Sequence, residues 1–514
     1  MVTVYFFTGR AKRFALNGGY MANQLLGIDI GTSACKVAVF DEAGKVLAQA
    51  NQPYKVYYPN PGWAEQDADE WYSAICLAIK DVLGTSGVSA DDICAIGIDG
   101  QGWSAIPVDK DGKALDRTPI WMDTRARDIC ERVKAEIGED AIFDVAGNDF
   151  LPSYTTPKMI WFKETKPEIF NKTYKFLQSN SYVAYKLTGV MSQDLSQGYG
   201  IHFFNMTTLE YDENLAKAMG LTKDLVPELY KCDDVVGKVT AEAAKITGLK
   251  AGTPVVAGGL DAACGTLGAG VYKLGQTQEQ GGQAGGMSIC TDKMLAHKKL
   301  IMGAHVVPGM YLLQGGTVGG GGTLKWFRQE LGRDMSFDEL TKEAEAVAPG
   351  SDGVTFLPYM AGERSPIWNP DAKGVYYGLG FDKTRGHLIR ATLEGVAYSL
   401  EHNLRVAGET GIDIGVLNAM GGSSNSLLWT QIKADVTGRT IQVPTSDTAT
   451  TLGAALLAGV GCGLYKGYDE AVSKTIVITR THEPDMEKHE LYKKSMELYL
   501  KLYENLKDTM SARF

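Results

Sequence analysis

The sequence has few of the patterns that mark disulfide-rich, metal-binding or membrane proteins. Its 514 residues include eight cysteines and seven histidines, with neither a C-x-x-C nor an H-x-x-x-H pattern. A disulfide framework or a built-in transition-metal centre is therefore not expected. Scattered thiols are typical of a reducing compartment, so we expect a cytoplasmic protein. No run of about 20 apolar residues occurs, and no membrane span is predicted.

An excess of basic residues is also missing. Lys and Arg number 51 against 61 for Asp and Glu, which leaves a net charge of −10. This balance argues against a nucleic-acid or membrane partner, because both usually need a clustered basic face. The sequence has no G-x-x-x-x-G-K-[ST] pattern, which excludes a P-loop enzyme. It has no G-x-G-x-x-G that opens a helix after the first strand, which disfavours a Rossmann dinucleotide site.

Glycine is the residue in excess. The chain has 60 glycines, whereas about 7% would be typical of a globular protein. They cluster without a fixed period, so a collagen-like chain is excluded. Clustered glycines indicate places where the backbone approaches a ligand closely.

Strand patterns alternate with helix patterns along most of the chain, which predicts an α/β fold. Strand-like segments are expected at 25–30, 35–41, 46–50, 93–99, 253–261 and 411–422, hairpin-like segments at 275–290 and 311–322, and helices from about Asp67, His387, Leu427 and Glu490. The pattern occurs once in residues 25–265 and again in residues 266–514, which predicts two lobes that face each other across a cleft. Residues 1–24 look like a leader or tag-like extension, since the first 20 contain three basic residues and no acid.

The first chemical motif is the segment Gly27-Ile-Asp29-Ile-Gly31-Thr32-Ser33-Ala-Cys-Lys36. A strand that ends in an acid and a Gly-Thr-Ser turn presents backbone N–H groups and hydroxyls to a phosphate. Asp29 could hold Mg²⁺ directly or through water, since that ion takes one or two carboxylates together with phosphate oxygens. The alternative is an ordinary tight turn.

Two more glycine motifs follow strand-like segments. Residues 315–322 contain six glycines in eight positions, at a folding cost of roughly 0.5–1 kcal/mol per glycine relative to alanine. Close approach to a nucleotide would offset that cost. Residues 420–425 read Met-Gly-Gly-Ser-Ser-Asn ahead of a helix and suit an adenosine or ribose. The alternative for each motif is a flexible linker.

Two longer patterns carry a family resemblance. The more specific one begins at Gly374-Val-Tyr376-Tyr-Gly378-Leu379 and continues after seven residues as His387-Leu388-Ile-Arg-Ala391-Thr392-Leu393-Glu394. The other is Ser153-Tyr-Thr155-Thr-Pro-Lys158-Met159-Ile-Trp161-Phe162, with Thr165 as a departure at its last position. From Leu25 to about residue 500 the chain resembles the FGGY carbohydrate kinases, relatives of actin, hexokinase and the Hsp70 ATPase.

The resemblance implies two actin-like (ribonuclease H-like) ATPase domains that face a central cleft, with ATP and Mg²⁺ as cofactors. Asp261 matches the family's catalytic base, which takes the proton of the attacking sugar hydroxyl; a helix N-cap is the alternative. Asp29, through water, and Asp261 match the metal site. Nucleotide-binding positions fall at Asp29, Gly31, Thr32, Ser33, Lys36, Gly282, Gln283, Gly321, Lys325, Gly421, Gly422 and Asn425.

The expected sugar-binding residues are Gln101, Gly102, Trp103 and Asp123, together with Asp261. Polar groups would bind adjacent hydroxyls, and the aromatic face would cover C–H edges. Alternatively, Trp103 is core and Asp123 only pairs with Arg125.

The arrangement is most similar to that of xylulokinases, which predicts conversion of D-xylulose to D-xylulose 5-phosphate. However, Gly102-Trp103 replaces the usual Met-His, and Ala262 replaces the usual Asn after the base. Another ketopentose, a tetritol such as erythritol, or another polyol is the runner-up substrate. A homodimer is left open.

Two other classes of function compete with a kinase. One is a nucleotide-switched interaction module of the actin or Hsp70 kind, and the other is a sensor that binds sugar without phosphorylating it. The retained carboxylates Asp29 and Asp261 argue against the sensor.

Overall fold

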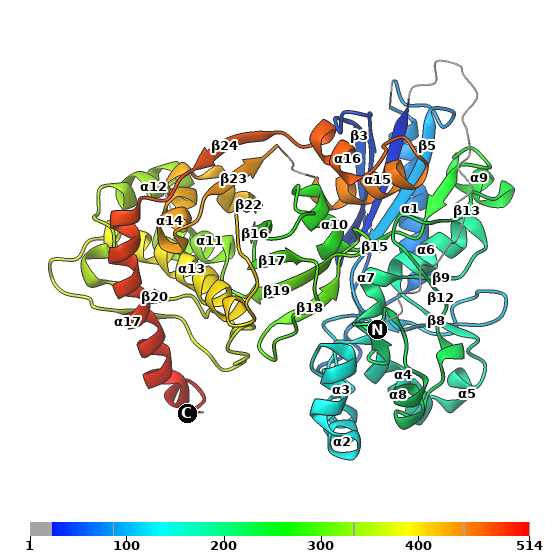
Figure 1. The fold of residues 1–514 in the computed structure, drawn as a ribbon, viewed down its shortest axis with the longest axis horizontal. Helices are drawn as coiled ribbons and strands as arrows, with labels where there is room; N and C mark the ends of the chain where they lie inside the picture. The colour runs from blue at the N-terminus through cyan, green and yellow to red at the C-terminus, as the bar shows by residue number, and fades with distance from the viewer. Residues whose placement is uncertain (1–22, 86, 333–334, 446–447, 513–514) are drawn as a thin grey trace, which may run out of the picture.

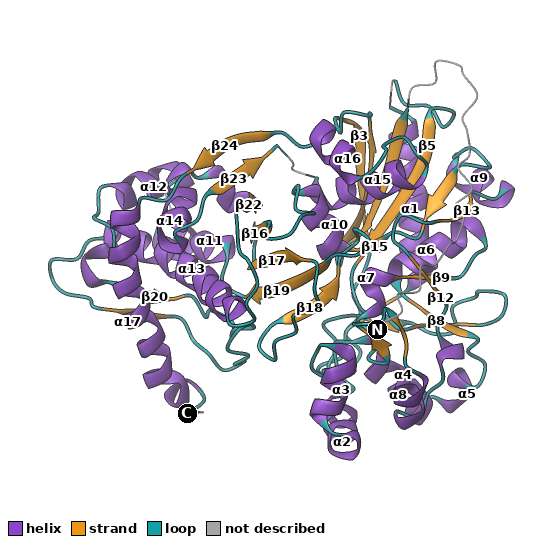
Figure 2. Ribbon diagram, in the orientation of Figure 1, coloured by secondary structure: helices purple, strands orange, loops and turns teal. Residues whose placement is uncertain are grey.

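Two seven-stranded sheets lie side by side in the computed structural model, which describes residues 23–85, 87–332, 335–445 and 448–512 (Figure 1). The expected leader lies almost entirely outside these residues. Helices flank both sheets, as Figure 2 shows. The alternation of strands and helices that the sequence predicts is therefore confirmed.

The first sheet has the strand order β13-β14-β5-β1-β2-β3, with β15 also paired to β5. Its strands are β1 (Gln24–Ile30), β2 (Ala34–Phe40), β3 (Val46–Pro53), β5 (Ile93–Gly100), β13 (Val235–Lys238), β14 (Pro254–Val256) and β15 (Gly259–Leu260). β1, β2 and β3 form an antiparallel meander, whereas β5 runs parallel to β1. Alternate residues of β1 face opposite sides, so both faces of the sheet are buried.

The second sheet has the order β18-β19-β17-β16-β22-β23-β24. Its strands are β16 (Thr277–Gly281), β17 (Gly285–Thr291), β18 (Ile301–Ala304), β19 (Tyr311–Thr317), β22 (Leu417–Met420), β23 (Ile441–Pro444) and β24 (Ile478–His482). β16 and β17 form the expected hairpin. The segment 311–322 is not a hairpin by itself: β19 pairs with β17 and β18, and its last glycines open a helix.

Helices and short strand pairs complete the two lobes. The helices are α1 (Ala68–Leu83), α2 (Arg127–Ile137), α3 (Glu139–Ala146), α4 (Thr155–Thr165), α5 (Pro167–Phe170), α6 (Ser179–Thr188), α7 (Leu195–Gly198), α8 (Glu213–Ala218), α9 (Ala241–Thr247), α10 (Asp261–Gly268), α11 (Gly321–Leu331), α12 (Phe337–Glu345), α13 (Arg385–Gly408), α14 (Leu427–Thr437), α15 (Ala449–Gly461), α16 (Tyr468–Thr475) and α17 (Met486–Met510). The short strands are β4 (Glu65–Gln66), β6 (Ile106–Val108), β7 (Thr118–Pro119), β8 (Lys175–Leu177), β9 (Ser192–Asp194), β10 (Phe204–Asn205), β11 (Glu210–Tyr211), β12 (Glu228–Tyr230), β20 (Thr355–Leu357) and β21 (Val375–Tyr377).

The helix predictions hold closely. Asp67 caps α1, because its side chain accepts a hydrogen bond from the backbone N–H of Asp69. One face of α17 packs into the core, with Tyr492, Met496 and Tyr499 each at most 1% exposed. Among the described helices, none is long and apolar enough to cross a membrane.

Helix α15 joins the first sheet although it comes from the last quarter of the chain. Figure 1 shows it in orange beside the blue strands. A Cβ atom at Gly97 of β5 would overlap the carbonyl oxygen of Ala454 in α15, and one at Gly27 of β1 would overlap that of Thr451. Glycine is required at these positions because the backbones touch. The predicted boundary between the two lobes at residue 265 stays a prediction. It assigns α15 to the second lobe, although α15 packs against the first sheet.

We expect Gly97→Ala to destabilise the protein by about 3 kcal/mol or more, because a backbone oxygen cannot move aside as a flexible side chain can. Gly408→Ala is the matched control: nothing lies within 4 Å of a Cβ at this helical position, so stability should rise by up to about 1 kcal/mol. Urea unfolding measures both. Equal stability of Gly97→Ala and wild type would contradict the packing.

Candidate active site

Three carboxyl groups gather at the carboxyl ends of adjacent parallel strands, where α/β proteins bind their ligands. Asp29 of β1 is in register with Asp99 of β5. β15 also runs parallel to β5, with Gly259 opposite Asp99. Asp261 follows two residues later as the first residue of α10. Asp29 and Asp261 are partly exposed, whereas Asp99 is fully buried.

Burial and mutual repulsion control the charge of these groups. Neither carboxylate oxygen of Asp99 receives a hydrogen bond from a donor. Burial, and then the charges of Asp29 and Asp261, raise its pKa well above the ordinary value, because a desolvated carboxyl among like charges favours its neutral form. Burial, followed by the charge of Asp29, raises the pKa of Asp261 to about 7.

The predicted phosphate turn links β1 to β2, with Thr32 partly exposed and Ser33 exposed. Two side chains hold its backbone: the Tyr54 hydroxyl donates to the Gly31 carbonyl, and Gln66 Nε2 donates to the Thr32 carbonyl at 2.9 Å. Lys36 lies opposite Asp29 in the β1–β2 register. Burial raises the pKa of Asp29, and the nearby charge of Lys36 offsets this only in part. The turn is thus fixed by the protein and its hydroxyl edge stays accessible.

The two other glycine motifs, 315–322 and 420–425, meet the turn of the β16–β17 hairpin in the second lobe. The backbone N–H of Gly321 donates to the Gly282 carbonyl at 2.7 Å, and that of Gly322 donates to Gln283 at 3.0 Å. A Cβ atom at Gly421 would lie 2.9 Å from the backbone of Gly281 and Gly282. The structure therefore brings together the β16–β17 hairpin, the start of α11 and the turn after β22.

The glycines of 315–322 have a reason that the sequence did not reveal. A Cβ atom at Gly319 would overlap the Pro358 carbonyl, and one at Gly320 would overlap the backbone of Ala284. At these two glycines protein backbone, rather than a ligand, occupies the space, and at Gly315 and Gly316 the side chains of Asn403 and Arg364 do so. By contrast, a Cβ at Gly422 would meet nothing within 4 Å, and one at Gly282 would meet only the Ala284 carbonyl oxygen, at 3.7 Å.

The residues around this open space suit a nucleotide. Gln283, Lys325, Gly421, Gly422 and Asn425 are exposed. Gln283 and Asn425 provide amides, Lys325 provides an ammonium group, and the two glycines expose their backbone where the three segments meet. This arrangement fits the predicted ATP site. Their roles in binding stay predictions.

Asp29 and Asp261 fit a Mg²⁺ ion that keeps several waters, because this ion needs few protein carboxylates. Within the described ranges, no three Asp, Glu, His or Cys side chains are placed to enclose a metal ion. The predicted metal site therefore depends on phosphate oxygens and water for its remaining ligands.

The expected sugar-binding segment follows β5. Gln101 is 1% exposed and donates to Gln66 at 2.7 Å, while its Oε1 has no hydrogen-bond partner. Trp103 is half-buried beside Tyr154, with ring centroids 4.3 Å apart, and its Nε1 also lacks a partner. Two unpartnered polar atoms in one segment indicate a place where a hydroxylated ligand or ordered water binds. A Cβ atom at Gly102 would lie 2.9 Å from Cδ1 of Leu260, so a larger residue there would require that side chain to shift.

Asp123 has protein partners for both carboxylate oxygens. Arg125 binds it through Nε at 2.9 Å and Nη2 at 2.7 Å, and the Ala64 N–H donates to it at 2.7 Å. Asp123 is 0% exposed. This geometry matches the alternative in which Asp123 pairs with Arg125, and its sugar contact stays an untested prediction.

Sequence analysis missed three residues that hold this region. Lys158 is fully buried and donates to the carbonyls of Trp103 at 2.8 Å and Ser153 at 2.6 Å. Burial lowers its pKa to about 7. Gln66 connects the phosphate turn to Gln101, and Trp121 Nε1 donates to the Thr32 hydroxyl at 3.0 Å. The position of Lys158 directly before the apolar run Met159–Phe162 was the one available signal.

Comparison with known families agrees with this geometry. Residues 24–268 match the N-terminal domain of the FGGY family of carbohydrate kinases, and residues 291–462 match its C-terminal domain. The chain belongs to this family. It is thus an ATP-dependent sugar kinase, and the predicted enzyme class is confirmed. Membership favours a kinase over an interaction module.

Individual relatives leave the sugar open. The chain is 31% identical over 490 residues to the xylulose kinase of Bacillus subtilis (strain 168), covering 95% of this chain and 98% of the relative. It is also 31% identical over 496 residues to the gluconokinase of Bacillus licheniformis, covering 94% and 96%. The crystal structure of xylulose kinase from Rhodospirillum rubrum superposes with a TM-score of 0.88 at 28% identity, covering 95% of this chain and all of that one. The two-domain actin-like fold is confirmed.

The raised pKa of Asp261 predicts a dependence of stability on pH. The folded-state pKa of about 7 exceeds the ordinary 3.8, so the folded state binds more protons between these values. Its contribution to stability is therefore lost as the pH rises towards 7. Asp261→Asn should be more stable than wild type above pH 7, by about 1–3 kcal/mol, with the difference vanishing near pH 4.

Urea unfolding between pH 4 and 8, with EDTA and without nucleotide, measures this difference. Asp128→Asn, at an exposed position in α2, is the control and should follow the wild-type curve. If Asp261→Asn also follows that curve, the side chain is not desolvated as described.

Proposed function

We propose that the protein transfers the γ-phosphate of ATP to a hydroxyl of a small ketose or polyol, with D-xylulose as the first choice. The observation that carries this proposal is the position of Asp261, which is partly exposed beside Asp29 where the strands of the first sheet end. The predicted phosphate turn lies at the same end of β1, because it begins at Gly31, two residues after Asp29.

Asp261 has the properties of a general base. A pKa of about 7 matches the pH at which such a base must be deprotonated and yet retain affinity for a proton. Its carboxylate would accept the proton of the attacking hydroxyl, the hydroxyl oxygen would bond to the γ-phosphorus of ATP, and the bond from that phosphorus to the β–γ bridging oxygen would break, with ADP as the leaving group. Phosphoryl transfer otherwise needs mainly positioning, which the glycine turns and the Gly31–Ser33 turn would supply. Mg²⁺, held by Asp29 and Asp261, would neutralise phosphate charge when bound.

The sugar site favours a short polyhydroxylated substrate. The unpartnered Oε1 of Gln101 and Nε1 of Trp103 offer one acceptor and one donor. Ala262, next to the base, is exposed and has no polar side-chain atom. A site with few hydrogen-bond partners discriminates weakly between analogues. The site alone does not select one sugar, so D-xylulose is proposed because several relatives are named xylulose kinase. Another ketopentose or a tetritol such as erythritol is the runner-up.

A phosphorylation screen tests the substrate. Pure protein with Mg·ATP is assayed against D-xylulose, L-xylulose, D-ribulose, erythritol, glycerol and gluconate by coupled ADP release. We expect the highest kcat/KM with a ketopentose or tetritol. Gluconate as the best substrate would contradict the proposed class, and sugar-independent ATP hydrolysis alone would contradict sugar phosphorylation.

Asp261→Asn should reduce kcat by about three or more orders of magnitude, because the hydroxyl loses its proton acceptor, while ADP affinity stays within about threefold of wild type. Asp128→Asn is the control and should keep full activity. Turnover of Asp261→Asn within tenfold of wild type would refute the assignment of the base.

A further inference from the structure

A buried ion pair lies directly beneath the predicted nucleotide site. Lys433 of α14 and Glu279 of β16 are joined at 2.6 Å between Nζ and Oε1, with side chains 2% and 4% exposed. Neither residue belongs to the sites predicted above. Burying two charges costs much of what their attraction returns, so such a pair is weak evidence for a stabilising role. Its position suggests another purpose.

Lys433 connects two of the segments that form the nucleotide site. Its Nζ also donates to the Ser423 hydroxyl at 2.8 Å, and Ser423 lies in the 421–425 turn. Glu279 lies two residues before Gly281, where β16 ends. One ammonium group therefore binds both the hairpin and the turn.

The packing around this group is tight. The Ser423 hydroxyl occupies the place that a Cβ atom of Gly281 would take, and Lys433 Nζ would lie 3.1 Å from that atom. Ser423 and Ser424 are 4% and 6% exposed, whereas Gly422 and Asn425 face solvent. The Ser423 hydroxyl thus anchors the buried middle of a turn whose outer residues are exposed.

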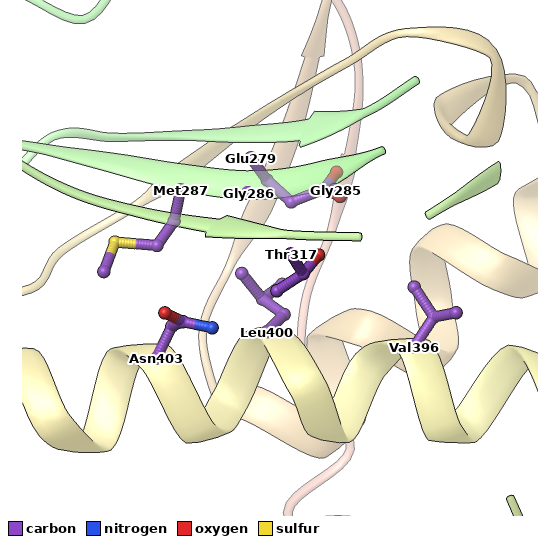
Figure 3. Close-up of a pocket in the computed structure, with 8 residues that line it drawn as sticks. All are labelled: Glu279, Gly285, Gly286, Met287, Thr317, Val396, Leu400 and Asn403. Carbon is purple, nitrogen blue, oxygen red and sulfur yellow. The ribbon is translucent and has the colours of Figure 1, made fainter. Parts of the chain in front are cut away.

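Glu279 also lines a small cavity between the second sheet and α13. Figure 3 shows Glu279 on its strand facing Thr317, with Asn403 and Leu400 of α13 on the opposite wall. The cavity has a volume of about 10 Å³, which is close to the space that one water needs. Glu279 Oε2 and Asn403 Oδ1 are both buried without a partner. A single water in the cavity could donate one hydrogen bond to each of these oxygens.

We propose that Lys433 is a positioning residue for the nucleotide. It acts through Ser423 and Glu279 and fixes the 421–425 turn against the β16–β17 hairpin. This proposal depends on the assignment of the nucleotide site given above. Without the ammonium group, the turn loses its anchor, and the buried carboxylate of Glu279 loses its ion-pair partner. The sugar site, in the first lobe, keeps its contacts.

Lys433→Met tests this role with two measurements. KM for ATP should rise tenfold or more, and Kd for ADP, from calorimetry, should rise by a similar factor. KM for the sugar should stay within twofold. A general loss of structure would not produce this separation. Arg390→Met is the matched control: it breaks the buried pair with Glu394, joined at 2.8 Å in the same lobe, and should lower the melting temperature with KM for ATP unchanged.

Ser423→Ala removes only the anchor and keeps the ion pair, so it should fold even if Lys433→Met does not. We expect a three- to tenfold rise in KM for ATP and in Kd for ADP. Wild-type ADP affinity in the variant that folds, or an equal rise in KM for the sugar, would overturn the positioning role.

The ADP measurement separates this proposal from the proposed reaction. If the wild-type protein binds ADP but phosphorylates no sugar in the screen, the proposed substrate class fails while the ADP affinities still decide the role of Lys433. If the wild-type protein binds no ADP, the positioning role is refuted together with the nucleotide site.

Discussion

Direct contact between backbones is the constraint on which the rest of the structure depends. At Gly27 and Gly97 the strands of the first sheet touch α15 without intervening side chains, and at Gly268 and Gly453 the helices α10 and α15 touch each other. These contacts fix α10 against β1 and β5. Because Asp261 opens α10 and Asp29 lies one residue before the end of β1, the same contacts fix the distance between the proposed base and the predicted phosphate turn.

The same closeness explains the electrostatics. Strands in parallel register place Asp29 and Asp99 on neighbouring positions, and α10 adds a third carboxyl group, that of Asp261. The protein tolerates this repulsion by keeping protons on buried acids. Crowding the carboxyl groups lowers the stability of the fold, but it also raises the pKa of the proposed base, Asp261, towards neutrality. A well-solvated carboxylate would be too weak a proton acceptor for this role.

Much of this could be predicted from the sequence, because strand patterns and their terminal acids are local signals. The ends of β1 and β5, the start of α13 and the position of Asp261 after a strand all follow from short patterns. Long-range pairs could not be found in this way. The contacts of Lys158 with Trp103, and of Lys433 with Glu279, join residues 55 and 154 positions apart. The reason for the glycines of 315–322 was hidden similarly, because their neighbours at Ala284 and Pro358 come from other segments.

The origin of α15 has a consequence for how the polypeptide matures. The face of the first sheet that contains Gly27 and Gly97 is covered by residues 449–461, so this lobe stays incomplete until nearly the whole chain has left the ribosome. A nascent fragment that ends near residue 265 would present a bare, glycine-lined apolar surface. The two lobes therefore cannot mature one after the other, and final closure of the first core must wait for the carboxyl-terminal part of the chain.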